Sequence, residues 1–420
     1  MLTTTRPVAP SSLIPARLLA GLDRRLLHLL AARLHPAALR FALGGESVSA
    51  SASPPVATIR FADRRALVGL AVDPERAFGD AFAEGRIEVD GDLVAALEAA
   101  YRGLEDGHPS WLRRVALDQR HSLRRDRGNI HRHYDLGNDF YAQWLDGQLV
   151  YTGAYFDSPV RSLEEAQVAK MDHVCRKLGL QPGETVVEAG CGWGALALHM
   201  ARHYGVRVRA FNISREQVRL ARDRAREQGL EDRVTFVEED YRRIDGPADV
   251  FVSVGMLEHV GRGQYGELAA VIARCLAGRR GRGLLHFIGR DAPLPLNAWI
   301  RRRIFPGAYA PTLEETFRGV LAPAGMSVLD VENLRLHYAL TLRHWRERYE
   351  RAVAEGRIGF DERFRRAWRL YLAGSEAAFS TGSLQLFQVL FAPHGSRAVP
   401  WTRAGLYRGG GGLAWNGPRS

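Results

Sequence analysis

A glycine-rich turn stands between an apolar segment and a helix-like segment, in Glu188-Ala-Gly190-Cys-Gly192-Trp-Gly194. Glycines at this spacing let the backbone turn sharply and leave room for a ligand against the start of the following helix. Glu188, at the end of the apolar segment, could accept hydrogen bonds from the polar end of that ligand. The spacing is GxGxG rather than GxGxxG, and no lysine stands beside it, so the turn favours a zwitterionic or cationic ligand over a pyrophosphate.

Two further polar groups belong to the same predicted site. Asp240 ends the apolar segment VTFVEED, where the carboxyl end of a strand could bring an acid to an adenine amino group. Another apolar segment ends in Phe211-Asn212 and offers no acid for a ribose, so Gln217 one turn later is a neutral candidate for that contact. Together with the glycine turn, this pattern is similar to the donor site of class I methyltransferases, which bind S-adenosylmethionine.

Alternating segments must position these residues, and they begin at about residue 160. A helix is predicted from Ser162, with Glu164 and Glu165 in its first turn, to Gly179. Four apolar segments are predicted to be strands: TVVEAG, VRVRAFNIS, VTFVEED and ADVFVSVGM. They alternate with the helix-like segments ALALHMARHYG and REQVRLARDRAREQG. A last predicted helix, FDERFRRAWRLYLAGSEAAF, precedes the strand-like SLQLFQVLF. This alternation predicts an α/β, Rossmann-like fold with a mostly parallel sheet and helices on both faces.

The first part of the chain has a different pattern. Residues 16–43 have helical spacing, with leucines on one face and arginines on another. Such a basic amphipathic helix either lies in a bilayer interface or forms the outer helix of a domain. VATIRF reads as a strand, and residues 73–104 are predicted to be mainly helical. The expected organisation is a flexible N-terminus (1–15), a small α+β accessory domain with a role in lipid or membrane contact (16–124), a methyltransferase domain (125–395) and a disordered Gly-rich tail (396–420).

Composition limits the classes of protein to consider. The chain has 420 residues, 46% of them hydrophobic and 25% charged, which suits two packed domains. Its formal net charge of +11 would suit a nucleic acid or an anionic phospholipid surface, but also a solvated Arg-rich surface. Cys175, Cys191 and Cys275 form no CxxC pair, as expected in a reducing cytosol. No run approaches the roughly 20 apolar residues of a membrane span, and no signal peptide is visible, so a cytoplasmic location is expected.

Further blocks match a known family in order and spacing. They are HRHYDLGNDFYAQWLD (131–146), VYTGAYF (150–156), VGMLEHVG (254–261), LLHFIG (284–289), IFPG (304–307) and HYALTLRHWRERY (337–349). From about residue 125 to 392 the chain resembles cyclopropane-fatty-acyl-phospholipid synthases and the related mycolic acid cyclopropane and methyl-branching synthases. The segment VDPERAFGDAFAEGRIEVDGD is similar to the accessory domain of the longer members.

The resemblance implies methyl transfer from S-adenosylmethionine to the double bond of an unsaturated fatty acyl chain, in a phospholipid at the inner face of the membrane. The resulting carbocation would lose a proton to a bound bicarbonate and close a cyclopropane. The residues that match the family's bicarbonate site are Glu258, His286, Tyr338, the Ile288 backbone and Gly153. Those that match its donor site are Tyr151, Thr152, Asn212 through Gln217, Asp240 and Tyr241. A membrane surface is an expected partner, nucleic acid is not, and a homodimer stays open.

Two positions depart from the family. Gly153 replaces a cysteine, which predicts a roomier bicarbonate pocket, and Ser375 replaces a second one. With neither thiol present, covalent cysteine catalysis is not expected. The roomier pocket leaves a methyl- or methylene-branched product as an alternative to the cyclopropane, and a lipid-binding protein with a vestigial donor site as a second alternative. A soluble methyltransferase acting on a small molecule or RNA is a third, although no RNA-binding motif is present.

Two histidine pairs could suggest a metal. His131 and His133 are two residues apart, and His199 and His203 stand four apart on one predicted helix. Neither pair has a cysteine or acid close in sequence that would complete a tetrahedral set, so no metal is expected.

Overall fold

The computed structural model describes residues 16–105, 136–276, 278, 281–396 and 402–407. The chain divides into two compact units, residues 1–108 and 109–420. The domain boundary expected near residue 124, the expected flexible terminus 1–15 and the pair His131/His133 lie outside the described residues.

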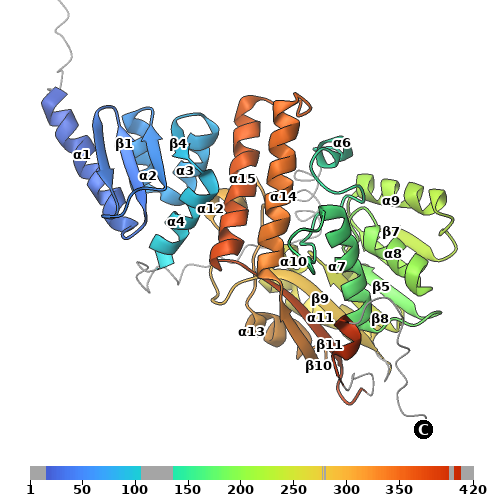
Figure 1. Ribbon diagram of the computed structural model, residues 1–420. Coiled ribbons are helices and arrows are strands. Elements are labelled where there is room, and N and C mark those ends of the chain that lie inside the picture. The colour runs from blue at the N-terminus through green and yellow to red at the C-terminus, as the bar shows by residue number, and fades with distance from the viewer. Residues whose placement is uncertain (1–15, 106–135, 277, 279–280, 397–401, 408–420) are drawn as a thin grey trace, which may run out of the picture. The chain divides into compact units, whose positions relative to one another are not determined.

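The first unit is a small α+β module (Figure 1). Its sheet has the order β2-β1-β3-β4, in which β1 and β3 are parallel and the two outer pairs are antiparallel. Its elements are α1 (Ala16–Arg33), β1 (Leu39–Leu43), β2 (Glu46–Ser49), β3 (Ala57–Phe61), α2 (Arg64–Val72), α3 (Pro74–Ala83), β4 (Ile87–Gly91) and α4 (Leu93–Glu105). Leu27 and Leu30 of α1 pack into one core with Phe41 and Ile59 of the sheet. That core gives the module a hydrophobic interior of its own.

The predicted helix over 16–43 is wrong in its last third. Helix α1 ends at Arg33, Pro36 follows, and residues 39–43 form strand β1 beside β3. Proline cannot continue the backbone hydrogen bonds of a helix interior. The segment 73–104 likewise contains a strand, β4, between its two helices, because its residues 87–91 pair with β3. Tertiary pairing overrides a helical pattern in both places.

The second unit is built on a seven-stranded sheet of order β10-β11-β9-β8-β5-β6-β7. The five strands from β9 to β7 are parallel to one another, and β11 runs antiparallel to both β9 and β10. The bounds are β5 (Thr185–Ala189), β6 (Arg207–Asn212), β7 (Val234–Glu238), β8 (Val250–Val254), β9 (Arg282–Gly289), β10 (Met326–Asn333) and β11 (Gln385–Pro393). This is the mostly parallel α/β sheet that the alternation of segments predicted.

Helices cover both faces of this sheet, and the alternation of strand side chains divides the core in two. Val186 packs with α7, α8 and α9, whereas its neighbour Val187 packs with α11 on the opposite face. The helices are α6 (Asn138–Ala142), α7 (Leu163–Leu178), α8 (Ala195–Tyr204), α9 (Arg215–Glu227), α10 (Leu257–Val260), α11 (Tyr265–Cys275), α12 (Ala298–Arg303), α13 (Leu313–Thr316), α14 (Arg335–Ala354), α15 (Glu362–Thr381) and α16 (Ala404–Tyr407). Long helices α14 and α15 lie side by side (Figure 1).

Local signals fix helix α7, which carries part of the site described below. The Ser162 side chain accepts from Glu165 N while the Glu165 carboxylate accepts from Ser162 N, which is a capping box. Gly179 ends the helix in the left-handed conformation, as its position in the sequence predicts. Within 396–420, where disorder was predicted, residues 404–407 instead form the short helix α16. None of the described helices has the length and apolar character needed to cross a membrane.

Candidate functional site

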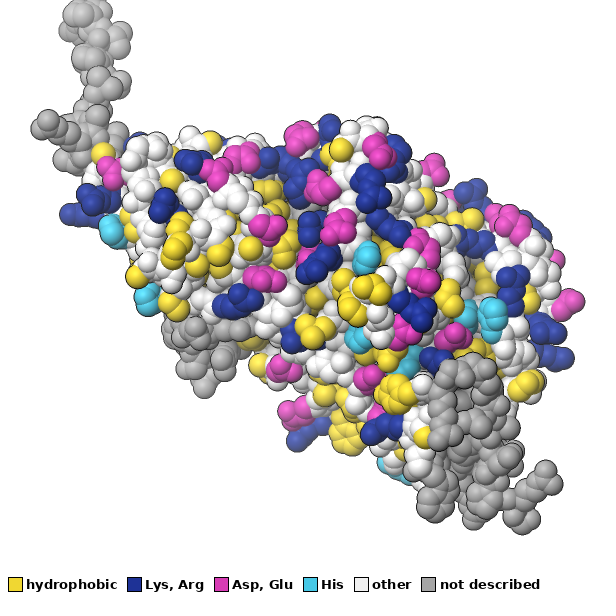
Figure 2. Space-filling model, viewed as in Figure 1, with side chains coloured by type: hydrophobic (Ala, Val, Ile, Leu, Met, Phe, Trp, Pro, Cys, Tyr) yellow, Lys and Arg dark blue, Asp and Glu magenta, His cyan; other side chains and the backbone are white. Residues whose placement is uncertain are grey.

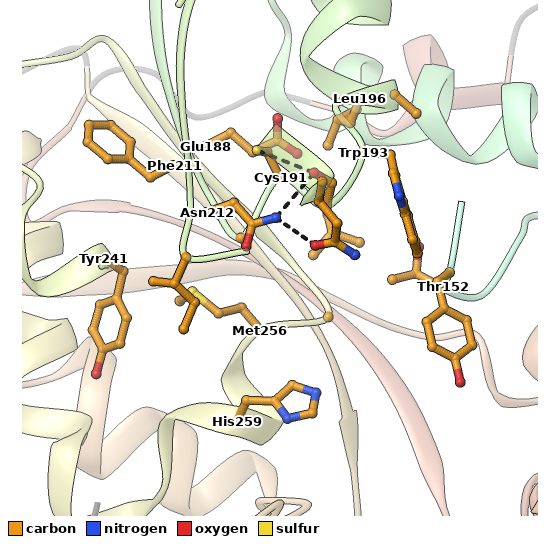
Figure 3. A pocket seen from close by; sticks show the side chains of 18 of the residues that line it. Thr152, Glu188, Cys191, Trp193, Leu196, Phe211, Asn212, Tyr241, Met256 and His259 are labelled. Carbon is orange, nitrogen blue, oxygen red and sulfur yellow. Dashed lines mark hydrogen bonds between the residues drawn. The ribbon is translucent and has the colours of Figure 1, made fainter. Parts of the chain in front are cut away.

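A pocket opens where β5, β6, β7 and β8 end (Figure 3). In a parallel sheet the carboxyl ends of neighbouring strands meet at one edge, where ligands bind. Most of the donor-binding residues predicted from the sequence line this pocket: Tyr151, Thr152, Glu188, Gly190, Gly192, Asn212, Gln217, Asp240 and Tyr241. The fold therefore brings four separate segments of the sequence to one place.

The glycine turn has the backbone conformation that the spacing predicts. Gly190, Gly192 and Gly194 all have positive φ, of 85°, 53° and 84°, which side chains rarely adopt. Gly190 and Gly192 line the pocket, but Gly194 is not among the lining residues. A Cβ at Gly194 would lie 2.6 Å from the Phe236 ring, so this glycine allows α8 to pack closely on the sheet. Its role is helix packing rather than contact with the pocket.

Glu188 presents an unusual carboxyl group to the pocket. It is buried, and its Oε2 has no hydrogen-bond partner among the described residues. Burial raises the pKa of Glu188 to about 8, and the charge of Lys170 opposes that rise. A buried carboxylate without partners costs free energy, which a cationic ligand group would offset. This matches the expected contact with the polar end of a donor.

Lys170 is the residue that sequence reasoning missed. No lysine stands beside the glycine turn in the sequence, but Lys170 of α7 lines the same pocket and donates to Thr152 Oγ1 at 3.0 Å. Burial lowers its pKa to about 8. The available signal was periodicity: Lys170 falls on the same buried stripe of α7 as Leu163, Ala166 and Val174. A lysine on the apolar face of a helix needs a specific reason.

Amide and acid groups occupy the other side of the pocket. Asn212 Nδ2 donates to Gln217 Oε1 at 2.7 Å and to the Gly192 carbonyl at 3.2 Å (Figure 3). The pair predicted for the ribose side is therefore one hydrogen-bonded unit tied to the glycine turn. Asp240 lies at the expected strand end, and both of its carboxylate oxygens accept from the Arg242 guanidinium, at 2.7 and 2.8 Å. Arg242 also lines the pocket and holds that carboxylate in place.

A constrained turn delivers Tyr151, Thr152 and Gly153. The buried Asp146 carboxylate accepts from Gln148 N at 2.9 Å and from Val150 N at 2.8 Å. Between those two residues Leu149 adopts a φ of 58°, which is unfavourable for a side chain of its size. Beyond the turn, the Tyr151 hydroxyl lies 2.8 Å from the Tyr371 hydroxyl of α15. These bonds fix the position of the segment without any ligand.

A second group of predicted residues lies beside the donor pocket. Glu258 of α10 and His286 of β9 are buried, and the Glu258 Oε1 accepts from the Ile288 N–H at 2.7 Å. Burial raises the pKa of Glu258 to about 7 and lowers that of His286 well below its usual value. His286 Nδ1 accepts from the Gln388 side-chain amide at 3.0 Å, which leaves the proton of the neutral ring on Nε2. Neither Glu258 Oε2 nor His286 Nε2 has a hydrogen-bond partner among the described residues.

Gly153 does not open extra space, which corrects the expectation of a roomier pocket. A Cβ at this position would lie 2.7 Å from Leu386 Cδ2 and 3.2 Å from Tyr338 Cγ. Leu386 stands opposite Ile288 in the pairing of β11 with β9. The volume that a larger side chain would take is therefore already filled by a leucine from the neighbouring strand. The Tyr338 ring closes in on the same position from α14.

Aromatic rings surround the segment that delivers Thr152. The Tyr151 ring lies 5.3 Å from the ring of Trp345, and the Tyr338 ring lies 5.8 Å from that of Trp345 and 4.5 Å from that of Phe379. Trp144 stands edge-on to both Tyr151 and Trp345. These rings pack against one another and exclude water from the segment that they surround.

The cysteines and the second histidine pair lie in surroundings that the sequence did not reveal. All three cysteines are buried free thiols. Cys191 lines the donor pocket, but burial raises its pKa well above the usual value, so it stays protonated. His199 binds the Asp172 carboxylate at 2.8 Å, an acid that the sequence did not place nearby. Even so, no group of three metal-ligating side chains occurs in the described part of the chain.

Comparison with known proteins places this site in a family. The family model described as Mycolic acid cyclopropane synthetase matches residues 121–389, which is more than half of the chain. The chain belongs to this family. The match runs through both groups of residues described above, from the turn at Asp146 to strand β11.

Individual relatives support the same family assignment. The "Probable fatty acid methyltransferase" of Pseudomonas putida is 38% identical over 363 residues, 81% of this chain and 89% of that protein. The "Cyclopropane-fatty-acyl-phospholipid synthase" of Escherichia coli (strain K12) is 39% identical over 261 residues, 62% of this chain and 66% of that protein. The crystal structure of "mycolic acid cyclopropane synthase CmaA1 complexed with SAH and CTAB" has a TM-score of 0.59 at 29% identity, and covers 63% of this chain and 97% of that one.

These similarities establish the enzyme class. The chain is an S-adenosylmethionine-dependent methyltransferase of the cyclopropane-fatty-acyl-phospholipid synthase type, with a class I fold. We call the pocket at the strand ends, which most of the predicted donor-binding residues line, the donor pocket. Glu258 lies on α10, which follows β8, Ile288 lies on β9, and Tyr338 lies on α14, which follows β10.

Proposed function

We propose that the enzyme transfers the methyl carbon of S-adenosylmethionine to the double bond of an unsaturated acyl chain in a phospholipid and closes a cyclopropane. The observation that carries the proposal is a pair of buried polar atoms, Glu258 Oε2 and His286 Nε2, that have no partner among the described residues. They stand beside a donor site, in an interior with aromatic walls. Buried polar groups in proteins are nearly always hydrogen-bonded, so these two await a ligand.

The chemistry requires this kind of interior. An isolated alkene is a weak nucleophile, so it must be held in line with a sulfonium methyl group at close distance. Transfer leaves a carbocation on the chain, which water would trap. The rings of Tyr338, Trp345 and Phe379 offer faces that favour a cation while excluding water. Proton removal from the transferred carbon then closes the ring.

The residues fit a bicarbonate ion. His286 Nε2–H points a donor at the site, and Glu258, whose pKa is raised to about 7 by burial, can hold a proton or accept one. Bound there, bicarbonate would supply the base that takes the proton. Gly153 adds no side chain, but Leu386 keeps its side of the site closed. The ion would therefore be held by Glu258, His286 and the neighbouring backbone.

The decisive experiment uses the purified enzyme, vesicles of unsaturated phospholipid and a donor with a deuterated methyl group. A cyclopropane product is one carbon heavier and has lost one hydrogen of the transferred methyl. A methyl branch, the first alternative, retains all of them, and a methylene branch is separated from the ring by its proton resonances. Unchanged acyl chains with every lipid tested would refute the proposal. Free fatty acid replaces the vesicles in a parallel reaction to test the phospholipid requirement.

Two single variants test whether these residues act in the reaction or in donor binding. We expect Glu258→Gln and His286→Ala each to lower turnover by at least about 100-fold. Because neither residue lines the donor pocket, the affinity for S-adenosylhomocysteine should change by less than about threefold, measured by calorimetry. Equal losses of turnover and of affinity would mean that these residues hold the donor instead. No affinity for the donor in the wild type would favour a lipid-binding protein with a vestigial site.

The acyl chain must reach the enzyme from a membrane. We infer that the enzyme works on the cytoplasmic leaflet of the inner membrane as a peripheral protein. The exposed apolar side chains of helix α1, Leu22 and Leu29, support this placement. A homodimer remains a prediction.

A further inference from the structure

Lys170 carries a buried charge that the protein itself does not balance. Its side chain is only 2% exposed, and its hydrogen bond goes to a neutral hydroxyl, Thr152 Oγ1. No carboxylate of the described residues forms an ion pair with it; Asp146 and Glu188 act on it only at longer range. Isolated ammonium groups are strongly disfavoured in a protein interior. An ammonium has three donors, so Lys170 retains capacity for a further acceptor.

The other buried lysine of the same helix provides the contrast. Lys177 lies two turns further along α7 and is equally enclosed. Its ammonium lies 2.5 Å from Glu332 and 3.5 Å from Asp330. Lys177 does not line the pocket, and the fold pairs its charge with two carboxylates. Lys170 has no such carboxylate partner among the described residues and lines the donor pocket instead.

Glu188 is the electrostatic counterpart of Lys170 in that pocket. Its Oε2 is buried without a hydrogen bond from any described residue, and it forms no ion pair with Lys170. A buried acid and a buried lysine thus line one cavity without an ion pair between them. A ligand that carries both a negative and a positive group would complement this lysine and this acid together. The amino-acid end of S-adenosylmethionine carries a carboxylate and an ammonium on one carbon.

We propose that Lys170 binds the α-carboxylate of S-adenosylmethionine, while Glu188 takes the α-ammonium. Thr152, through its bond to Lys170 Nζ, orients the ammonium group toward the ligand. Lys170 is then the residue that makes the site specific for donors that have an intact amino-acid end. The inference concerns the donor only, so it stands or falls independently of the acyl substrate and of bicarbonate.

The test compares three ligands by calorimetry on the full-length enzyme: S-adenosylmethionine, decarboxylated S-adenosylmethionine and 5′-methylthioadenosine. We expect the wild type to prefer S-adenosylmethionine over the decarboxylated form by about 10- to 100-fold, the range of a buried charge pair. In Lys170→Met that ratio should fall close to one, because only the carboxylate contact is lost. The affinity for 5′-methylthioadenosine, which lacks the amino-acid end, should be unchanged.

The matched control is Lys177→Met, from the same helix. It should lower the unfolding temperature and leave the ligand ratio as in the wild type. Lys170→Arg keeps the charge and should keep most of the preference; it also serves if Lys170→Met does not fold. The proposal is overturned if the wild type binds both donors equally. It is also overturned if the Lys170 variants weaken all three ligands by one factor, which would indicate a structural role.

Discussion

At the scale of the residue, burial controls the chemistry of Glu258. Its carboxyl group is held by a single bond from the Ile288 N–H, and burial raises its pKa from 4.5 to about 7. Between those values the folded state holds a proton that the unfolded state releases. Stability contributed by the protonated form is therefore lost as pH rises through 7. The same property lets the group exchange a proton near neutrality.

Glu258→Gln should remove this pH dependence. Glutamine keeps the oxygen that accepts from Ile288 N but cannot ionise. We expect the stability difference between the wild type and Glu258→Gln to move in favour of the variant from about pH 5 to 8, by up to about 3 kcal/mol. Urea unfolding at a series of pH values, in buffers free of carbonate, measures it. Parallel curves for the two proteins would mean that Glu258 does not titrate in this range.

Gly153 offers a second prediction at this scale. A Cβ there meets Leu386 Cδ2 at 2.7 Å, so Gly153→Ala should destabilise the enzyme by about 1–3 kcal/mol through overpacking. Leu386→Val shortens the opposing side chain, and the double variant should recover at least about 0.5 kcal/mol relative to additivity. Urea unfolding of the four proteins gives this coupling. Leu390→Val, a buried change on β11, is the control and should combine additively with Gly153→Ala.

At the scale of the element, helix α1 has two different faces. Leu27 and Leu30 enter the core of the first unit, which makes α1 the outer helix of a domain. Leu22 and Leu29 lie on its exposed side, 46% and 42% accessible, near the exposed Arg25. The structure thus shows α1 as the outer helix of a domain, and contact of its exposed face with a bilayer stays a prediction.

The exposed face of α1 should contribute to membrane binding. Replacing Leu22 and Leu29 by aspartate removes apolar contact and adds charge, so we expect binding to anionic phospholipid vesicles to fall by at least about tenfold. Vesicle sedimentation measures it. Val72→Asp, at an exposed apolar position of α2, is the control, and the affinity for S-adenosylhomocysteine should stay constant in all variants. Unchanged sedimentation of the double variant would remove α1 from the membrane contact.

At the scale of the whole molecule, the formal net charge is +11, and the face seen in Figure 2 is not uniformly basic. Figure 2 shows Lys and Arg side chains interspersed with Asp and Glu on the face in view. Many arginines have acidic partners; Arg343 and Arg346, for example, both bind the buried Glu376. Attraction to an anionic membrane must therefore come from local groups rather than from the total charge.

Because the two units have separate hydrophobic cores, we expect their thermal unfolding to respond differently to a donor-site ligand. The first unit has its own hydrophobic core, and the donor pocket lies wholly within the second. Calorimetric scans should therefore contain a transition that S-adenosylhomocysteine raises and another that it leaves in place. At about 100 times its dissociation constant, the ligand should add about 2.7 kcal/mol to the second unit alone. A single transition that shifts as a whole would show that the units unfold together.

The sequence by itself determined the parts of this enzyme that depend on local pattern. The glycine turn after β5, the capping box of α7 and the strand–helix alternation act over a few residues, so they could be read directly and predicted the fold and the donor site. Family blocks added Glu258, His286 and Tyr338.

Contacts between distant segments were decided only by the tertiary structure. Lys170 enters the donor pocket because a buried stripe of α7 faces the strand ends. Leu386 fills the space beside Gly153 because β11 pairs with β9, more than two hundred residues after that glycine. Gly194 serves helix packing because Phe236 arrives from another strand. Side-chain periodicity gives the face that a residue occupies, but the partner on that face depends on how the strands are ordered.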